Sequence, residues 1–199
     1  SAFMEMPGER IGIVQAFGDG YFTRIVTAGD VASVRVQDPA ILTVRFRDFV
    51  LGSVGPGTRR VTLGQVKYDD LYGGYQEQMG GLLEGGADGL LIETCQDLLQ
   101  IKAAVAAAMA VMGPKSDKLL YVSVTVETTG TLLVGSSIWA VMAALEPFPI
   151  DVLGLNCATG PEAMKRHLEA LAKLWKTGIG CMPNAGLPSL VAGQVHYPL

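Results

Sequence analysis

The chain has 199 residues, of which 49% are hydrophobic and 17% are charged, so it is long enough to bury the core of one domain. Its formal net charge of −4, from 15 basic and 19 acidic residues, provides no basic surface for a phosphate backbone, and we expect no nucleic-acid partner. No apolar run approaches the roughly 20 residues that span a membrane, and no secretory signal opens the sequence. The three cysteines are widely spaced, which predicts free thiols and a cytoplasmic protein rather than a disulfide framework.

Residues 1–47 have the pattern of a strand-rich segment. Short apolar runs cover residues 11–17, 21–26, 31–36 and 41–46, and Gly-Asp and Asp-Pro turns separate them. No helical pattern lies between these runs, so they do not resemble β/α units. We therefore predict a boundary at residue 47, with residues 1–47 unassigned and residues 48–199 as a domain of another kind.

From residue 48 onward, short apolar runs alternate with helical patterns. Gly85-Gly86 is expected to end the first helix, Asp97 to cap the second, and Pro161 to begin the last. Such alternation predicts a parallel sheet covered on both faces, either doubly wound or part of an eight-unit barrel. No glycine-rich GxGxxG follows the first strand, which disfavours a dinucleotide-binding fold. The predicted strands are residues 49–54, 89–92, 120–126, 150–155 and 178–182, and the predicted helices are residues 68–84, 97–112, 137–145 and 161–175.

Polar residues gather where these strands end. In parallel β/α folds, ligands bind beyond the carboxyl ends of the strands, so these side chains are the candidates for a site. Each of them alone is most simply a cap or turn residue, but their position on one edge of one sheet indicates a shared function. The candidates are Ser53 with Gly55, Glu93 with Thr94 and Asp97, Glu127 with Thr128 and Thr129, Asn156 with Cys157 and Thr159, and Asn184.

Cys157 ends an apolar strand and precedes a loop into a helix, a position that suits a nucleophile or a metal ligand. A free cysteine otherwise often fills a core as a small hydrophobic residue, and we expect this of Cys181; Cys95 could be either. No Ser-His-Asp or Cys-His arrangement is present. His167 lies in the middle of a predicted helix and is expected on its surface, and His196 is near the C-terminus.

Five motifs, in continuous order over residues 48–199, resemble those of homocysteine S-methyltransferase domains. Within that family the likeness is greatest to the homocysteine-binding domain of the cobalamin-dependent branch. The motifs are GSVGP at 52–56, EGGAD at 84–88 with LIETCQD at 91–97, VSVTVE at 122–127, GLNCATGP at 154–161 and MPNAGLP at 182–188.

The resemblance implies a parallel (β/α)8 TIM-type barrel of which units three to seven are recognisable, and a methyltransferase that converts homocysteine to methionine. In this family, zinc held by three cysteine thiolates binds the homocysteine sulfur, and Cys157 matches the first of those ligands. Glu93 matches the position that binds the substrate ammonium, and the backbone at Ala158 is expected to contact its carboxylate. Asn184 and Asp97 are expected to shape the pocket.

The resemblance also implies partners and reveals differences. The methyl group is expected from methylcobalamin on another module, so cobalamin- and folate-binding modules are the expected partners. The family's other two zinc ligands form an adjacent Cys-Cys pair, which this sequence does not contain, and the motifs of the first two barrel strands are absent from residues 1–47.

Two alternatives follow from these differences. The chain could be an inactive fragment or a non-catalytic partial barrel whose open sheet edges associate with another chain. It could also be an unrelated barrel enzyme in which Glu93, Asp97 and Glu127 hold a hard divalent cation such as magnesium.

Overall fold

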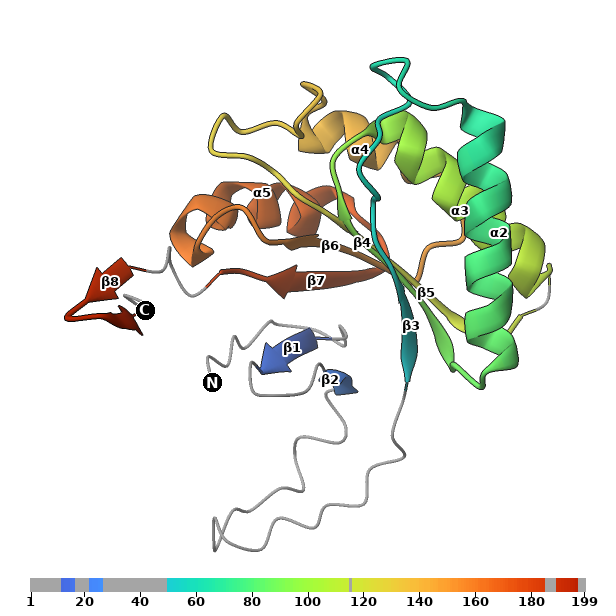
Figure 1. Cartoon of the computed structure of the whole chain (residues 1–199), viewed down its shortest axis with the longest axis horizontal. Coiled ribbons are helices and arrows are strands. Elements are labelled where there is room, and N and C mark those ends of the chain that lie inside the picture. Colours follow the sequence, from blue (N-terminus) through green and yellow to red (C-terminus); the bar gives the residue numbers. More distant parts are fainter. Residues whose placement is uncertain (1–11, 17–21, 27–49, 115, 185–188, 197–199) are drawn as a thin grey trace, which may run out of the picture.

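The computed structural model describes residues 12–16, 22–26, 50–114, 116–184 and 189–196, and its centre is a five-stranded parallel sheet (Figure 1). All five predicted strands and all four predicted helices are present. The strands are β3 Leu51–Val54, β4 Gly89–Cys95, β5 Leu119–Val124, β6 Val152–Asn156 and β7 Gly178–Met182, and the helices are α2 Tyr68–Glu84, α3 Leu98–Met112, α4 Ile138–Leu145 and α5 Pro161–Leu174.

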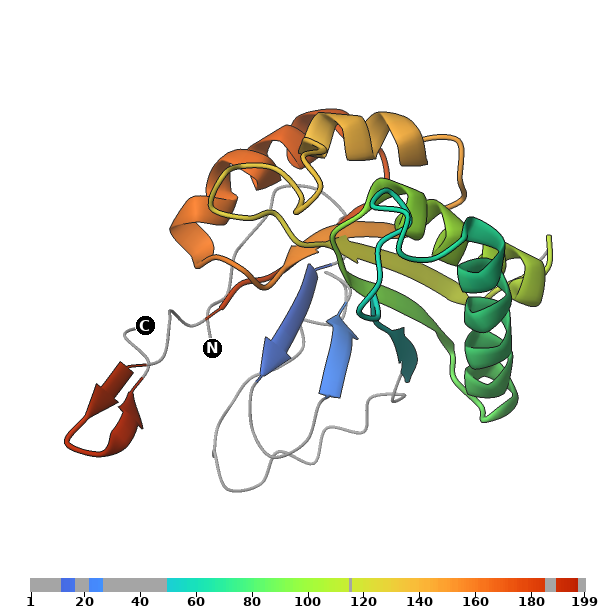
Figure 2. The same ribbon diagram turned by 45° about the horizontal axis from the view of Figure 1, so that its top comes forward.

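The sheet has the topology of a barrel segment. Its strand order is β3-β4-β5-β6-β7, which is the order of the sequence, whereas a doubly wound sheet reverses its order at a switch point. Successive helices contact one another, α2 with α3, α3 with α4 and α4 with α5, and all four lie along the convex side of the curved sheet (Figure 2). This arrangement decides between the two folds that the sequence left open, because a doubly wound sheet has helices on both faces, whereas the concave face of a barrel is covered by side chains of its own strands.

Helix boundaries follow from the residues that end them. The Asp97 carboxylate accepts a hydrogen bond from the Leu99 amide and caps α3, as predicted, and the Ser137 hydroxyl caps α4 in the same way. Helix α2 ends at Glu84, and Gly86 then takes a left-handed conformation with φ 95°, which glycine adopts at little cost. None of these described helices is both long enough and apolar enough to cross a membrane.

Two apolar layers hold the sheet. The larger layer lies between the sheet and the helices and contains Cys95, with Cys181 packed against it. The smaller layer lies on the other face and consists of Leu91, Tyr121, Val152 and Met182. Tyr121 is fully buried there, and its ring crosses β6 and β7 at Gly154 and Gly180, where no side chain stands in its way.

His167 corrects an expectation from the sequence. It was expected on the surface of α5, but only 4% of it is exposed. It lies on the same face of the helix as Met164 and Leu171, which are also buried, and its Nε2 accepts a hydrogen bond from Nε of Arg166. Burial, and then the Arg166 charge, lower the pKa of His167, so the imidazole is neutral at physiological pH.

Two of the four strands predicted in residues 1–47 lie within the described residues, and both are present. Strands β1 Gly12–Ala16 and β2 Phe22–Val26 pair antiparallel, and β1 contacts β7 (Figure 2). The other two predicted strands, residues 31–36 and 41–46, lie outside the described residues.

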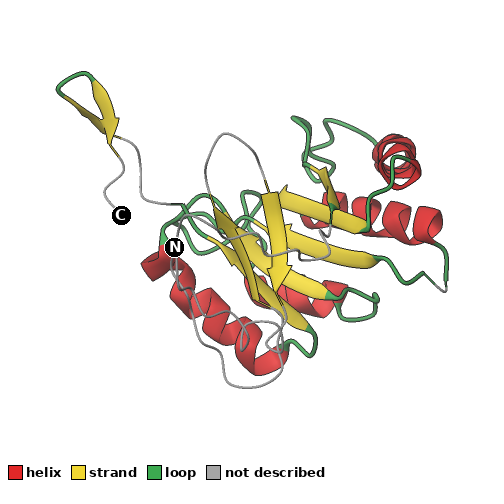
Figure 3. Ribbon diagram, turned by 90° about the horizontal axis from the view of Figure 1, so that it is seen from below, coloured by secondary structure: helices red, strands yellow, loops and turns green. Residues whose placement is uncertain are grey.

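A C-terminal hairpin was not predicted. It is formed by β8 Ser189–Val191 and β9 Gln194–His196 and lies away from the sheet (Figures 1 and 3). Ala192 and Gly193 form its turn with φ values of 51° and 79°, the positive pair that a two-residue type I′ turn requires.

The crossing of Tyr121 over β7 makes a stability prediction. Gly180→Ala should lower the free energy of unfolding by about 1–3 kcal/mol, because the new Cβ would collide with the Tyr121 hydroxyl and ring. Urea unfolding followed by circular dichroism would measure it. Tyr121→Leu should cost less in the Gly180→Ala background than alone, since it removes the colliding atoms. Gly73→Ala, in an open position of α2, is the matched control and should not destabilise. Equal losses for the two alanine variants would contradict this packing.

Candidate functional site

The candidate site begins at the carboxyl end of β4. The register between β4 and β5 shifts between Ile92 and Cys95, and Thr94 has a positive φ of 58°, which is costly for a β-branched residue. Glu93 therefore lies in a bulge of the strand rather than in a loop after it. Its carboxylate accepts a 2.5 Å hydrogen bond from the Ser53 hydroxyl at the end of β3. The bulge directs this half-buried carboxylate toward the neighbouring strand end.

Asn156, the last residue of β6, connects three strands. Its Oδ1 accepts hydrogen bonds from the Thr94 amide at 3.1 Å and from the Ser123 hydroxyl of β5 at 2.8 Å. Its Nδ2 donates to the Thr94 hydroxyl at 2.8 Å and to Sγ of Cys157 at 3.2 Å. Asn156 is only 2% exposed, so this amide is fully used within the protein. It fixes the Glu93–Thr94 bulge relative to Cys157.

Cys157 lies in a strained turn. Cys157 and Ala158 have φ values of 59° and 56°, so two successive non-glycine residues are left-handed. The Cys157 amide donates to Met182 O on β7 at 3.2 Å, and the Asn184 amide donates to Thr159 O at 3.1 Å. The loops after β6 and β7 are thus joined to each other. Strained backbone of this kind clusters at functional sites, and here it is confined to the ends of β4 and β6 within the sheet.

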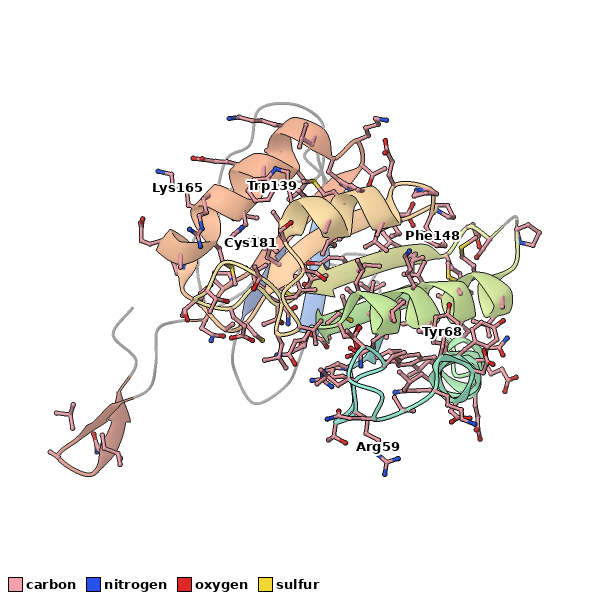
Figure 4. The ribbon with its side chains drawn as sticks, turned by 90° about the horizontal axis from the view of Figure 1, so that it is seen from above. Arg59, Tyr68, Trp139, Phe148, Lys165 and Cys181 are labelled. Atoms are coloured by element: carbon pink, nitrogen blue, oxygen red, sulfur yellow. The ribbon has the colours of Figure 1, made fainter. Side chains whose placement is uncertain are left out.

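Asp97 holds a loop. Its carboxylate accepts hydrogen bonds from the amide and hydroxyl of Thr62, at 2.9 and 2.6 Å, besides capping α3. Gln100 of α3 donates to Pro56 O in the same β3–α2 loop, whose tip carries Arg59 (Figure 4). Asp97 is fully buried, and these contacts hold the β3–α2 loop against the start of α3.

A second polar chain lies along the same edge. Nη2 of Arg60 donates to Oε1 of Gln96 at 2.6 Å, and Nε2 of Gln96 donates to the Glu127 carboxylate at 3.2 Å. Glu93, Asp97 and Glu127 therefore have three separate sets of partners. Among the described residues, no group of three or more His, Cys, Asp or Glu side chains could hold a metal ion. The reading of these three carboxylates as ligands of a hard cation was wrong.

The structure brings together Ser53, Glu93, Asn156 and Cys157, all named from the sequence. Sequence reasoning missed Ser123, Thr62, Arg60 and Gln96. Ser123 could have been found from strand alternation, since it shares a face of β5 with the inward Tyr121. Thr62, Arg60 and Gln96 carried no such signal, because their contacts depend on how the β3–α2 loop folds over α3.

The donors present do not by themselves fit zinc, which in structural sites takes four ligands. Cys157 is the one cysteine at this edge. Cys95 is completely buried in the layer beneath the helices, and Sγ of Cys181 lies 3.9 Å from Sδ of Met164 on α5 (Figure 4). The expectation that Cys181 belongs to the core is confirmed, and Cys95 belongs there too. One thiolate remains, which is one third of the ligand set that the resemblance implies.

Comparisons with known proteins agree with this architecture. The homocysteine S-methyltransferase family model matches residues 23–199, and so extends into the segment that the sequence left unassigned. Methionine synthase of Mycobacterium leprae is 49% identical over 172 residues, which are 86% of this chain and 14% of that protein. Methionine synthase of Mycobacterium tuberculosis is 49% identical over 152 residues, 76% of this chain and 13% of that protein. The chain thus spans about one seventh of the length of these relatives.

A solved structure is also similar. The apo crystal structure of the homocysteine methyltransferase MmuM from Escherichia coli aligns with a TM-score of 0.52 at 23% identity. The alignment covers 68% of this chain and 59% of that one. At this identity the match supports the fold alone, which is a TIM-type barrel represented here by five of its strands.

The buried amide of Asn156 makes the first prediction for the site. Asn156→Leu keeps the approximate volume but leaves the Thr94 amide and two hydroxyls without partners, and should lower the free energy of unfolding by about 2–4 kcal/mol. Chemical denaturation would measure this. Ser123→Ala removes only one donor to the same amide and should cost about 1 kcal/mol. Similar costs for the two variants would show that Asn156 does not connect the strands.

The thiols make the second prediction. Burial raises the pKa of Cys95 to about 12 and that of Cys181 to about 11, so both are protonated at pH 8. Iodoacetamide at pH 8 should therefore modify Cys157 alone in the folded chain, as read by peptide mass spectrometry. Labelling of Cys181 should rise as the pH approaches 11, and Cys95 should react only after unfolding. Modification of Cys95 before Cys157 in folded protein would contradict the assigned burial.

Proposed function

The chain belongs to the homocysteine S-methyltransferase family, and from that premise we propose that it forms the homocysteine-binding part of a methionine synthase. The observation that carries the proposal is the joined pair of strained turns, Glu93–Thr94 on β4 and Cys157–Ala158 on β6, which Asn156 holds together. Both turns lie at the carboxyl edge of the barrel strands, where barrel enzymes bind their substrates.

Each end of an amino acid has a suitable partner here. We assign the Glu93 carboxylate, oriented by the Ser53 hydroxyl, to the substrate ammonium, because a half-buried carboxylate attracts a cation strongly. The carboxylate of the substrate suits the backbone at Ala158 and the first turn of α5. The N-cap of that helix is Gly160, which has no side chain, and Pro161 at the first position has no N–H; the amides of Glu162 and Ala163 that follow have no side-chain cap and can bind an anion. Asn184 and Asp97 position the loops that border this space.

The chemistry of the complete protein is a transfer of a methyl group to the homocysteine sulfur, which loses its proton and becomes the thioether of methionine. We propose methylcobalamin on another module as the donor, and cobalamin- and folate-binding modules as partners, since this chain matches about one seventh of its relatives. Cys157 would be one thiolate of a zinc site whose other ligands come from outside this chain. The three free thiols suit a reducing, cytoplasmic location.

The domain boundary at residue 47 is also part of the proposal. We place the homocysteine-binding barrel segment at residues 48–199. The family match begins at residue 23, which supports a relation between residues 23–47 and the same fold. No contact in the described residues favours the alternative of a non-catalytic association module.

The proposal is tested by direct binding of homocysteine to the chain. Glu93→Gln should weaken binding at least tenfold, because it removes the charge that pairs with the ammonium. Ligand-observed NMR at pH 7.5 would measure the dissociation constant. Glu146→Gln is the matched control: it neutralises an exposed carboxylate that pairs with Lys176 at 2.9 Å and should leave binding unchanged. An unchanged affinity in Glu93→Gln would refute the assigned role.

A further inference from the structure

We infer that this chain binds the amino-acid end of its substrate without a metal ion, and that it does not distinguish a thiol from a hydroxyl at the other end. The inference rests on the proposed function and concerns the specificity of the same site. It follows from an imbalance between two halves of that site. The residues assigned to the ammonium and carboxylate are held by contacts within the described sheet, whereas the described residues hold no set of ligands that would bind sulfur through zinc.

The first part of this imbalance is the number of cysteines at the site. The sequence has three cysteines, and only Cys157 lies at the carboxyl edge of the sheet. Cys95 follows Glu93 by two residues, but the bulge of β4 turns it to the opposite face, where it is fully buried beneath the helices. Cys181 precedes Met182 on β7 and also faces the helices, with Met164 as its sulfur contact. Neither can reach the Cys157 sulfur without turning its strand over.

Other ligand types do not complete a metal site with Cys157 either. The Asn156 amide donates to Sγ of Cys157, so that neighbour supplies a proton donor rather than a metal ligand. The Glu93 carboxylate is the group assigned to the substrate ammonium, and His167 is buried on α5 with its Nε2 accepting from Arg166. No cluster of three ligands exists among the described side chains. A single thiolate does not provide the ligand set that holds zinc tightly.

The amino-acid half depends on none of these missing groups. Glu93 is fixed through Ser53 and through the Thr94 contacts to Asn156, and all of these residues lie on β3, β4 and β6 of the described sheet. The Ala158 turn is fixed by hydrogen bonds from the loop residues Cys157 and Asn184 to neighbouring backbone. Binding of the substrate ammonium and carboxylate therefore requires only Glu93 and the Ala158 turn, which existing contacts already hold in place.

A difference in specificity follows. When a metal ion binds the substrate sulfur, replacement of the thiol by a hydroxyl removes a ligand bond and the affinity falls steeply. Where the sulfur has no partner beyond apolar and weakly polar contacts, the same replacement changes little, since a site discriminates only through groups that contact the replaced atom. We therefore expect L-homocysteine and L-homoserine to bind this chain with dissociation constants within about threefold of each other.

The test compares these two amino acids on the full chain by ligand-observed NMR, under reducing conditions, first with a chelator and then with added zinc. The expected result is similar affinity for both ligands, unchanged by zinc, with binding of both weakened at least tenfold in Glu93→Gln. Glu146→Gln, at the exposed pair with Lys176, should match the unaltered chain. Zinc measured by atomic emission after dialysis should be far below one ion per chain.

Two results would overturn the inference, and they are distinguishable. Stoichiometric zinc after dialysis, or homocysteine binding more than tenfold tighter than homoserine when zinc is present, would mean that the chain completes a metal site, and the proposed function would stand. Failure of both amino acids to bind, in a chain whose circular dichroism and unfolding are those of a folded protein, would refute the proposed function together with the inference.

Discussion

The side-chain amide of Asn156 is the interaction on which the site depends. It is buried at the end of β6 and uses both of its ends, accepting from Thr94 and Ser123 and donating to Thr94 and Cys157. The left-handed turns beside it each cost about 1–3 kcal/mol, and persist only where surrounding contacts determine them. Each buried hydrogen-bonding group left unpaired would cost about the same. The free energy gained from the hydrogen bonds of Asn156 and the free energy cost of the strained turns are therefore of comparable size. The strained turns are retained because releasing them would leave the Asn156 amide without its partners.

Much of the fold could be predicted because its determinants are local. Strands β3 to β7 are short apolar runs, and helices α2 to α5 begin or end at residues such as Asp97, Ser137 and Gly86, whose effects act within one turn. The burial of His167 was also open to prediction, since its spacing from Met164 and Leu171 places all three on one helical face. The polarity of the imidazole suggested a surface position, but the spacing of His167 decides where it lies. The sequence left both a doubly wound sheet and a barrel segment open, because apolar strands look alike whether helices or opposing strand side chains cover them.

The site was less predictable because its contacts join residues far apart in the sequence. The sequence identified Glu93, Asn156 and Cys157 because they follow the predicted strands. Their mutual placement depends on the bulge in β4, which no residue type indicates. Thr62 contacts Asp97, and Arg60 contacts Gln96, across 35 and 36 residues. Such contacts form only once a loop has folded over a helix. The candidate residues Glu93 and Cys157 could thus be named from the pattern, while several of the residues that fix the surrounding loops were found only from the structure.

The order of strands explains which contacts of the candidate site form within this sheet. The turns after β4 and β6 are separated in the sheet by β5 alone, and Ser123 on that strand contacts the same amide as Thr94. The contacts that hold Glu93, Thr94 and Asn156 therefore come from β3, β5 and β6, which belong to the same described sheet. A zinc site has a different requirement, because the metal takes three or four protein ligands. In this chain β6 supplies Cys157, and β7 presents its cysteine to the helices. The arrangement of Glu93, Thr94 and Asn156 is therefore a property of the local strand pairing, whereas a zinc site needs more ligands than the described residues bring together at this edge.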